Sequence, residues 1–92
     1  MKAIAEVQVI PIGSGVSVRQ EVKRAHQLLI DAGLKVELHA YGSNVEGDLD
    51  KVLDAVRLVH ETLHGEGVVR LSTFVKIGTR TDKPPTLEGK LF

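Results

Sequence analysis

Residues 34–47 read LKVELHAYGSNVEG, and this stretch decides the fold. Apolar residues hold the even positions from Leu34 to Ala40, and mostly polar ones hold the odd positions from Lys35 to Tyr41. Such alternation is typical of a strand with one buried face. GSN at 42–44 then turns the chain, and NVEG at 44–47 begins another short strand. The stretch therefore predicts two consecutive strands in the middle of the chain.

On both sides of this pair of strands, the chain has a segment in which apolar residues recur at helical spacing. Before it, apolar residues recur from Val18 to Ala32, and SVRQ at 17–20 has the form of a capping box, so we expect a helix over about 17–32 that ends at Gly33. After it, Asp48 favours a helix N-terminus, and Gly65 and Gly67 end the pattern. The apolar stripe of this second helix consists of Leu49, Val52, Leu53, Val56, Val59 and Leu63.

One further strand is predicted at each end of this central block. AIAEVQVIPI at 3–12 alternates valines with Glu6 and Gln8, and VVRLSTFVKIG at 68–78 alternates as well. Residues 78–92 form a polar tail in which Pro84 and Pro85 impose an extended course. We expect a short strand near its end, at LEGKLF (87–92).

The resulting order, strand–helix–strand–strand–helix–strand, predicts the α+β class and a ferredoxin-like β-α-β-β-α-β sandwich over residues 1–92. Two helices would cover one face of a four-stranded antiparallel sheet, and no element of the chain would cover the other. That open face is either hydrated or closed by a second copy around a polar ligand. Its expected residues are Glu6, Gln8, Lys35, Glu37, His39, Arg70, Ser72, Phe74 and Lys76.

Composition argues against several classes of function. Twelve basic residues balance twelve acidic ones, so no overall positive field attracts nucleic acid. Phe74 has no aromatic partner in the first strand for stacking bases. The absence of cysteine excludes disulfides and thiol nucleophiles. The N-terminus has neither the apolar run of a signal peptide nor the ~20 residues of a membrane span. We expect a cytoplasmic protein without membrane or nucleic-acid partners.

HETLH at 60–64 matches the zinc-protease pattern H-E-x-x-H. Arg70 stands where the longer metzincin pattern needs a third histidine, and Glu88 lies in the tail. His60 can equally fill the margin of the core, and His64 can interact with the C-terminal helix dipole. We therefore expect no metal site and no catalytic residue, with a zinc peptidase as the remaining enzymatic alternative.

Two segments invite an anion-binding interpretation. GSGVSVRQ at 13–20 has the position of a phosphate loop but the spacing of neither common phosphate-loop pattern, so a turn and a helix cap account for it better. KIGTRTDK at 76–83 gathers Lys76, Arg80 and Lys83. These three residues could contact an anion or form a solvated basic turn.

Three segments of the chain carry a resemblance to a known family, in this order: AEVQVIPIGSG (5–15), GLKVELHAYGSNVEGDLDKVLDAVRLVHETL (33–63) and VVRLSTFVKIGTRTDKPPTLEGK (68–90). They resemble the family of small thiamine-binding proteins, whose patterns correspond to Glu6–Gly13, Gly42–Asp48 and Arg70–Lys83. Relatives often have threonine where Ser43 stands. The resemblance implies a ferredoxin-like fold, a homodimer or homotetramer formed through the open sheet face, and binding of thiamine or its hydroxymethylpyrimidine moiety without catalysis or any other cofactor.

Thiamine combines a cationic thiazolium with an aminopyrimidine, and therefore needs a carboxylate, neutral hydrogen-bonding groups and an aromatic ring. Phe74 could lie against the thiazolium, an interaction of about 0.5–2 kcal/mol. Glu46 lies just before a helix N-terminus, which should lower its pKa. The expected ligand-binding residues are Glu6, Gln8, Glu37, Ser43, Asn44, Glu46, Ser72, Thr73 and Phe74.

Two alternatives remain for these polar residues. Glu37 and Glu46 could simply pair with basic residues across the strands, which stabilises a sheet by roughly 0.2–1 kcal/mol per pair. The whole polar face could then serve only an assembly or regulatory contact, without any ligand.

Overall fold

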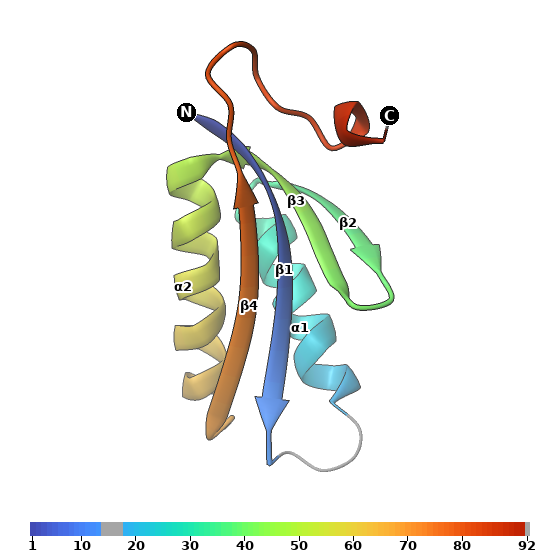
Figure 1. Ribbon diagram of the computed structural model, residues 1–92. Helices are drawn as coiled ribbons and strands as arrows, with labels where there is room; N and C mark the ends of the chain where they lie inside the picture. Colours follow the sequence, from blue (N-terminus) through green and yellow to red (C-terminus); the bar gives the residue numbers. More distant parts are fainter. Residues whose placement is uncertain (14–17, 92) are drawn as a thin grey trace.

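The computed structural model describes residues 1–13 and 18–91. In chain order, its elements are β1 (Lys2–Ile12), α1 (Arg19–Asp31), β2 (Lys35–His39), β3 (Gly42–Asp48), α2 (Leu49–Gly65), β4 (Arg70–Gly78) and the short 3-10 helix η1 (Glu88–Lys90). The strands form one antiparallel sheet in the order β2-β3-β1-β4. Both helices lie behind the sheet in Figure 1. The predicted ferredoxin-like sandwich is confirmed.

The helix ends show why the chain turns where it does. Asp48 caps α2, its carboxylate accepting the N–H of Asp50 at 3.0 Å, as the sequence predicted. Gly33 follows α1 with a φ of +85°, a left-handed conformation that favours glycine after a helix. The capping box predicted at 17–20 depends on Ser17, which lies outside the described residues.

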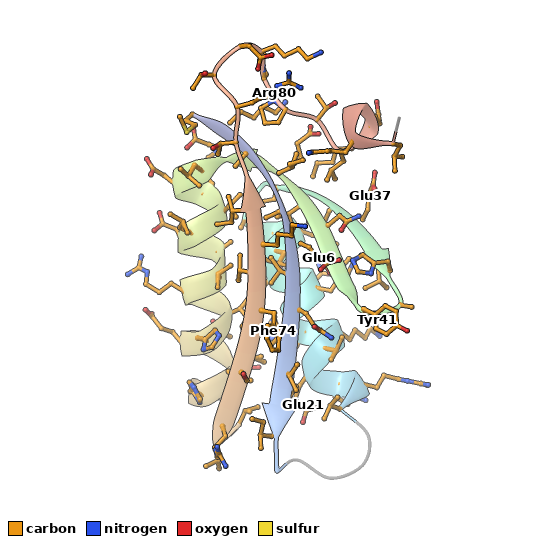
Figure 2. All side chains as sticks on the ribbon, in the orientation of Figure 1. Glu6, Glu21, Glu37, Tyr41, Phe74 and Arg80 are labelled. Carbon is orange, nitrogen blue, oxygen red and sulfur yellow. The ribbon has the colours of Figure 1, made fainter. Side chains whose placement is uncertain are left out.

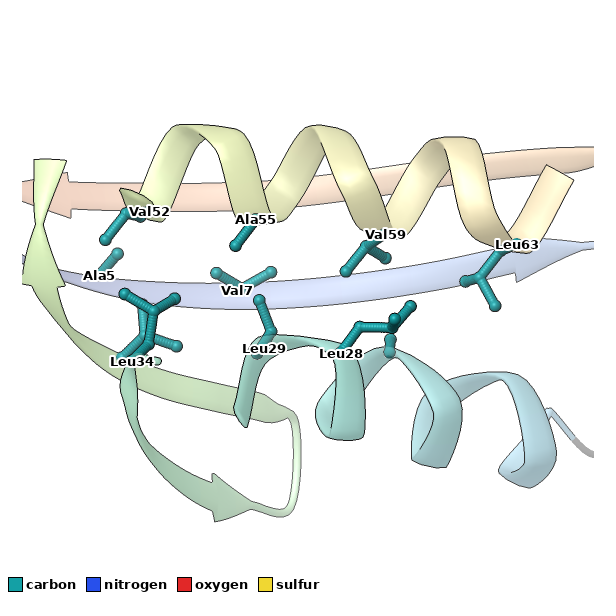
Figure 3. Packing of buried hydrophobic residues seen from close by; sticks show 11 residues of the cluster. Ala5, Val7, Leu28, Leu29, Leu34, Val52, Ala55, Val59 and Leu63 are labelled. Carbon is teal, nitrogen blue, oxygen red and sulfur yellow. The ribbon is translucent and has the colours of Figure 1, made fainter. Parts of the chain in front are cut away.

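The core lies between β1 and the two helices (Figure 3). Its most deeply buried large side chains are Leu29, Leu63, Val45, Val52 and Val59, each at most 2% exposed. Leu53 was expected in the apolar stripe of α2 but is 49% exposed. Neighbouring helical residues differ by about 100° in direction, so α2 buries Val52 and Ala55 and turns Leu53 outward.

The segment after β4 differs from the sequence prediction. Residues 87–92 were expected to form a strand, but Glu88–Lys90 form a turn of 3-10 helix. Leu87, which is only 9% exposed, donates its backbone N–H to Glu46 Oε1 at 2.7 Å. The segment therefore packs across the sheet through Leu87 and does not pair along a sheet edge. None of the helices in the described part of the chain is long and apolar enough to cross a membrane.

The face of the sheet away from the helices is partly covered by this C-terminal segment, which arches over one end of β1 and β3 in Figure 1. Ile4 points to this face and is only 7% exposed. Ile10 and Ile12 of β1 share the face by strand alternation. The expectation of a polar face that the chain leaves wholly uncovered was therefore wrong. The polar and exposed part, which we call the open face, begins at Glu6.

Candidate functional site

A row of polar side chains crosses the open face where all four strands run side by side. The register places Asn44 of β3 opposite both Glu37 of β2 and Glu6 of β1. Glu6 in turn lies opposite Lys76 of β4. Because neighbouring strands are about 4.8 Å apart, these side chains form a contiguous row. Figure 2 shows Glu6 in the middle of the sheet and Glu37 toward its edge.

The next row along β1 carries Gln8 and Phe74, which lie opposite each other. The Phe74 side chain is 65% exposed. On the β2 side, His39 Nε2 lies 3.3 Å from Glu6 Oε2, yet it makes no hydrogen bond of acceptable geometry to any described residue. Nδ1 of His39 accepts the backbone N–H of Tyr41 at 3.2 Å, so the ring carries a proton on Nε2, the nitrogen that lies beside the Glu6 carboxylate. Ser72 follows on β4 and is exposed.

Two expected ligand residues, Ser43 and Thr73, lie on the opposite side of the sheet, against the helices. Ser43 is 5% exposed, and its Oγ lies 3.1 Å from Nδ1 of His26 on α1. Thr73 Oγ1 lies 2.6 Å from Nε2 of His60 on α2. The structure therefore does not gather all the expected residues in one place.

Glu46 is engaged within the chain. Its Oε1 accepts the Leu87 N–H, and its Oε2 lies 3.5 Å from Lys2 Nζ. The Leu87 N–H lowers the pKa of Glu46, with help from Lys2 and Lys35 and against its partial burial. The direction agrees with the prediction, but the donor belongs to the C-terminal segment and not to the start of α2. Glu46 therefore anchors this segment to the sheet.

A cavity of about 230 Å³ lies between α1, β1 and the β2–β3 connection. We call it the hairpin cavity. Aliphatic side chains of β1 and α1 make up most of its wall. Its polar lining residues are Gln8, His26, His39, Tyr41 and Ser43. A concave, mainly apolar space with a few convergent polar groups is typical of small-molecule sites.

The hairpin cavity exists because the strands beside β1 differ in length. β3 pairs with β1 only as far as Ser43 opposite Val7, whereas β4 pairs with β1 up to Ile12. From Gln8 onward, one edge of β1 therefore has no neighbouring strand. Backbone N–H and C=O groups on such an edge need other partners, and a bound ligand could supply them.

Gly42 allows the β2–β3 connection to close against β1 at this point. A Cβ atom at Gly42 would lie 2.5 Å from the carbonyl oxygen of Val7, far inside van der Waals contact. Glycine is therefore required at the edge of the cavity, because the two backbones approach too closely here for a Cβ atom.

The two histidines of the HETLH stretch have separate partners. His60 contacts Thr73, and His64 Nδ1 lies 2.7 Å from the carbonyl oxygen of Val68. Within residues 1–13 and 18–91, no group of three His, Cys, Asp or Glu side chains is placed to hold a metal ion. The geometry therefore gives no support to the zinc-peptidase alternative.

The sequence reasoning missed three cavity residues: His26, His39 and Tyr41. His26 lies four residues after Val22 and three before Leu29, both expected in the core, so helical spacing alone could have placed it beside the sheet. His39 was assigned to the open face but not to the site. Tyr41, at the tip of the hairpin in Figure 2, is 77% exposed and lines the cavity entrance.

Comparison with known proteins is consistent with this architecture. A UPF0045 protein of Synechocystis is 45% identical over 91 residues, covering 99% of this chain and 75% of its own. The solved structure of a Methanocaldococcus jannaschii protein has a TM-score of 0.91 at 43% identity, covering 98% of this chain and 92% of its own. A Thermotoga maritima protein whose description connects it with thiamine biosynthesis or salvage shares the fold, with a TM-score of 0.87 at 21% identity over 99% of this chain and 96% of its own.

The family-level comparison covers nearly the whole chain. The model of the family described as thiamine-binding protein matches residues 5–92, which include most of β1 and all of the later elements from α1 to η1. The resemblance first seen in three sequence segments therefore extends over both helices and all four strands, and the chain belongs to the thiamine-binding protein family.

Proposed function

We propose that this protein binds thiamine, or its hydroxymethylpyrimidine moiety, in the hairpin cavity and acts as a carrier, buffer or sensor. The observation that carries the proposal is the part-buried Ser43–His26 pair in an otherwise mainly apolar cavity. Sites for drug-sized ligands occupy about 300–1,000 Å³. At about 230 Å³, this cavity suits a single substituted ring better than the whole vitamin.

The aminopyrimidine ring would enter the cavity, where Ser43, His26 and Gln8 offer hydrogen-bond donors and acceptors. The thiazolium ring would then remain at the cavity mouth, near the open face. There, Glu6 supplies a negative charge and Phe74 an exposed aromatic ring. The cavity is lined by β1 residues that point to both faces of the sheet. This placement therefore uses expected ligand residues from both faces.

Calorimetric titration with thiamine and with hydroxymethylpyrimidine tests the proposal. Ser43→Ala should raise the Kd of both ligands roughly 5- to 30-fold, because about 1–2 kcal/mol is lost when a buried hydrogen-bonding group has no partner. Thr73→Ala is a matched control, since it also removes a hydroxyl group that contacts a histidine, whereas Thr73 does not line the cavity. Its ligand affinities should stay unchanged.

Glu6→Gln separates the two halves of the ligand in the same experiment. It should weaken thiamine, whose thiazolium is cationic, and leave hydroxymethylpyrimidine unaffected. If neither ligand binds the wild-type protein at millimolar concentration, the proposal fails and a ligand-free assembly module becomes the better description.

Binding without chemical conversion is part of the proposal. Ser43 and His26 are the types of group used in nucleophilic catalysis, but such a pair works with a third group that orients the base. No hydrogen bond from residues 1–13 or 18–91 to Nε2 of His26 provides that orientation. Thiamine recovered after the titration should therefore be chemically unchanged.

We also infer that copies of the chain associate through the end of the open face that the C-terminal segment leaves uncovered. Exposed apolar side chains gather there, with Phe74 65% and Ile12 37% exposed. Ile12→Asp should lower the molar mass measured by light scattering, because a charge buried in a contact is costly. Leu53→Asp, on the outer surface of α2, is the control and should leave the mass unchanged. A monomeric wild-type protein would contradict the inference.

A further inference from the structure

The C-terminal segment forms a second concave region on the sheet, away from the hairpin cavity. Beyond Gly78 the chain rises from β4 and returns over the ends of β1 and β3 (Figure 1). Two contacts hold it there: the Leu87 N–H bonds Glu46, and Lys35 Nζ lies 2.9 Å from Glu88 Oε1. The segment is thus fixed at its far end while its middle stands away from the sheet.

Two hollows under this segment adjoin each other. The inner hollow, of about 300 Å³, lies on the open face and includes Glu6 and Lys76. The outer hollow, of about 520 Å³, lies between Gly78 and the returning segment. Ile4, Gly78 and Lys90 line both, so the two hollows share part of their wall.

The outer hollow is cationic in a chain whose total charge is zero. Its ionisable lining residues are Arg80, Lys83 and Lys90, with no carboxylate among the lining residues that the structure describes. Arg80 is neutralised by Asp82, since its Nε lies 2.6 Å from Oδ1. Lys83 and Lys90 form no ion pair with the described residues. Among the residues that the structure describes, no carboxylate therefore pairs with these two positive charges, which can meet an anion.

Strand geometry connects this region with the hairpin cavity. Every second residue of β1 points to the same face of the sheet, and successive residues on that face are about 6.6–7 Å apart. Gln8 at the cavity, Glu6 at the proposed cation position and Ile4 at the hollows therefore lie in one line along β1. A ligand whose pyrimidine lies in the cavity and whose thiazolium lies near Glu6 can direct its hydroxyethyl arm along this line. A phosphate ester on that arm would then reach the two lysines.

From this arrangement we propose that the hollows beneath the C-terminal segment receive the phosphate group of the ligand, so that the site accepts thiamine phosphate esters. The inference rests on the proposed function and extends it to a class of ligand. A single phosphate carries a charge between −1.5 and −2 near neutral pH, which Lys83 and Lys90 can balance. The basic cluster seen in KIGTRTDK thus acquires a role through Lys83, together with Lys90 from η1.

The test compares the Kd of thiamine, thiamine monophosphate and thiamine diphosphate for the same protein. In 50 mM salt the esters should bind at least about tenfold more tightly than thiamine, and the advantage should shrink in 500 mM salt, where the Debye length is much shorter. The double variant Lys83→Gln/Lys90→Gln should abolish the advantage while the Kd of thiamine stays unchanged. Lys23→Gln/Lys51→Gln makes the same change in net charge on exposed helical positions and should have no effect.

The outcomes separate this inference from the proposed function. If thiamine binds but its phosphate esters bind no more tightly, the phosphate inference is overturned and the proposed function stands. If the esters bind more tightly in both double variants alike, the two lysines are not the phosphate site and the inference is again overturned. If thiamine fails to bind while pyrophosphate alone binds, both the proposed function and the inference are refuted.

Discussion

Replacement of Leu63 by alanine is expected to lower the free energy of unfolding by about 2–5 kcal/mol. Leu63 is 1% exposed and lies in the last turns of α2 against β1 (Figure 3). Its truncation removes buried apolar surface and leaves a cavity that the surrounding core fills only in part. Since small domains are stable by only about 5–15 kcal/mol, this single change would remove a large share of the total.

Urea denaturation followed by circular dichroism measures this effect. Leu58→Ala is the matched control, because it makes the same change on the same helix at a residue that is 44% exposed. It should shift the free energy of unfolding by no more than about 0.5 kcal/mol. Equal losses in the two variants would contradict the placement of the core on the Leu63 side of α2.

The second large effect is expected from Gly42→Ala. The new methyl group would meet the backbone oxygen of Val7 at 2.5 Å, and a backbone atom cannot move aside as a flexible side chain can. The β2–β3 connection must shift, at a cost of about 1–3 kcal/mol or more. Because Gly42 borders the hairpin cavity, we expect the affinity for thiamine to fall together with the melting temperature.

Gly65→Ala provides the control for this variant. Gly65 ends α2 with no neighbouring heavy atom within 4 Å of a Cβ, so alanine there should be neutral or stabilise the protein by up to about 1 kcal/mol. Differential scanning calorimetry and thiamine titration of both variants decide the matter. A Gly42→Ala protein with unchanged melting temperature and affinity would show that the connection does not close on β1 in this way.

The sequence predicted the architecture because two periodicities alternate clearly along the chain. The helical stripe ending at Leu63 and the two-residue alternation around Val7 are physical consequences of burying one side of each element. The end of the chain was predicted less well. Leu87 looked like part of a strand, whereas it docks on Glu46, a contact that joins residues far apart in sequence and leaves no local pattern.

The candidate site could be predicted only in part. Because residues 42–44 were interpreted as a turn, the sequence did not predict which face of the sheet Ser43 would occupy. β3 in fact begins at Gly42, and strand alternation then points Ser43 toward the helices and Asn44 to the open face. Thr73 already followed the helix-facing pattern of its strand. The cavity itself was beyond sequence reasoning, because it arises from the register at which β3 stops pairing with β1.

The short reach of the β2–β3 hairpin has a wider consequence for evolution and engineering. Adding about two residues to each strand of the hairpin would lengthen it by the same number of residue pairs. The new backbone of β3 would then pair with β1 where the cavity now lies. The opening would then be sealed without any change to its lining side chains. Loop length, and not only residue identity, would therefore control access to the cavity, and we expect insertions near Tyr41 to abolish the proposed ligand binding.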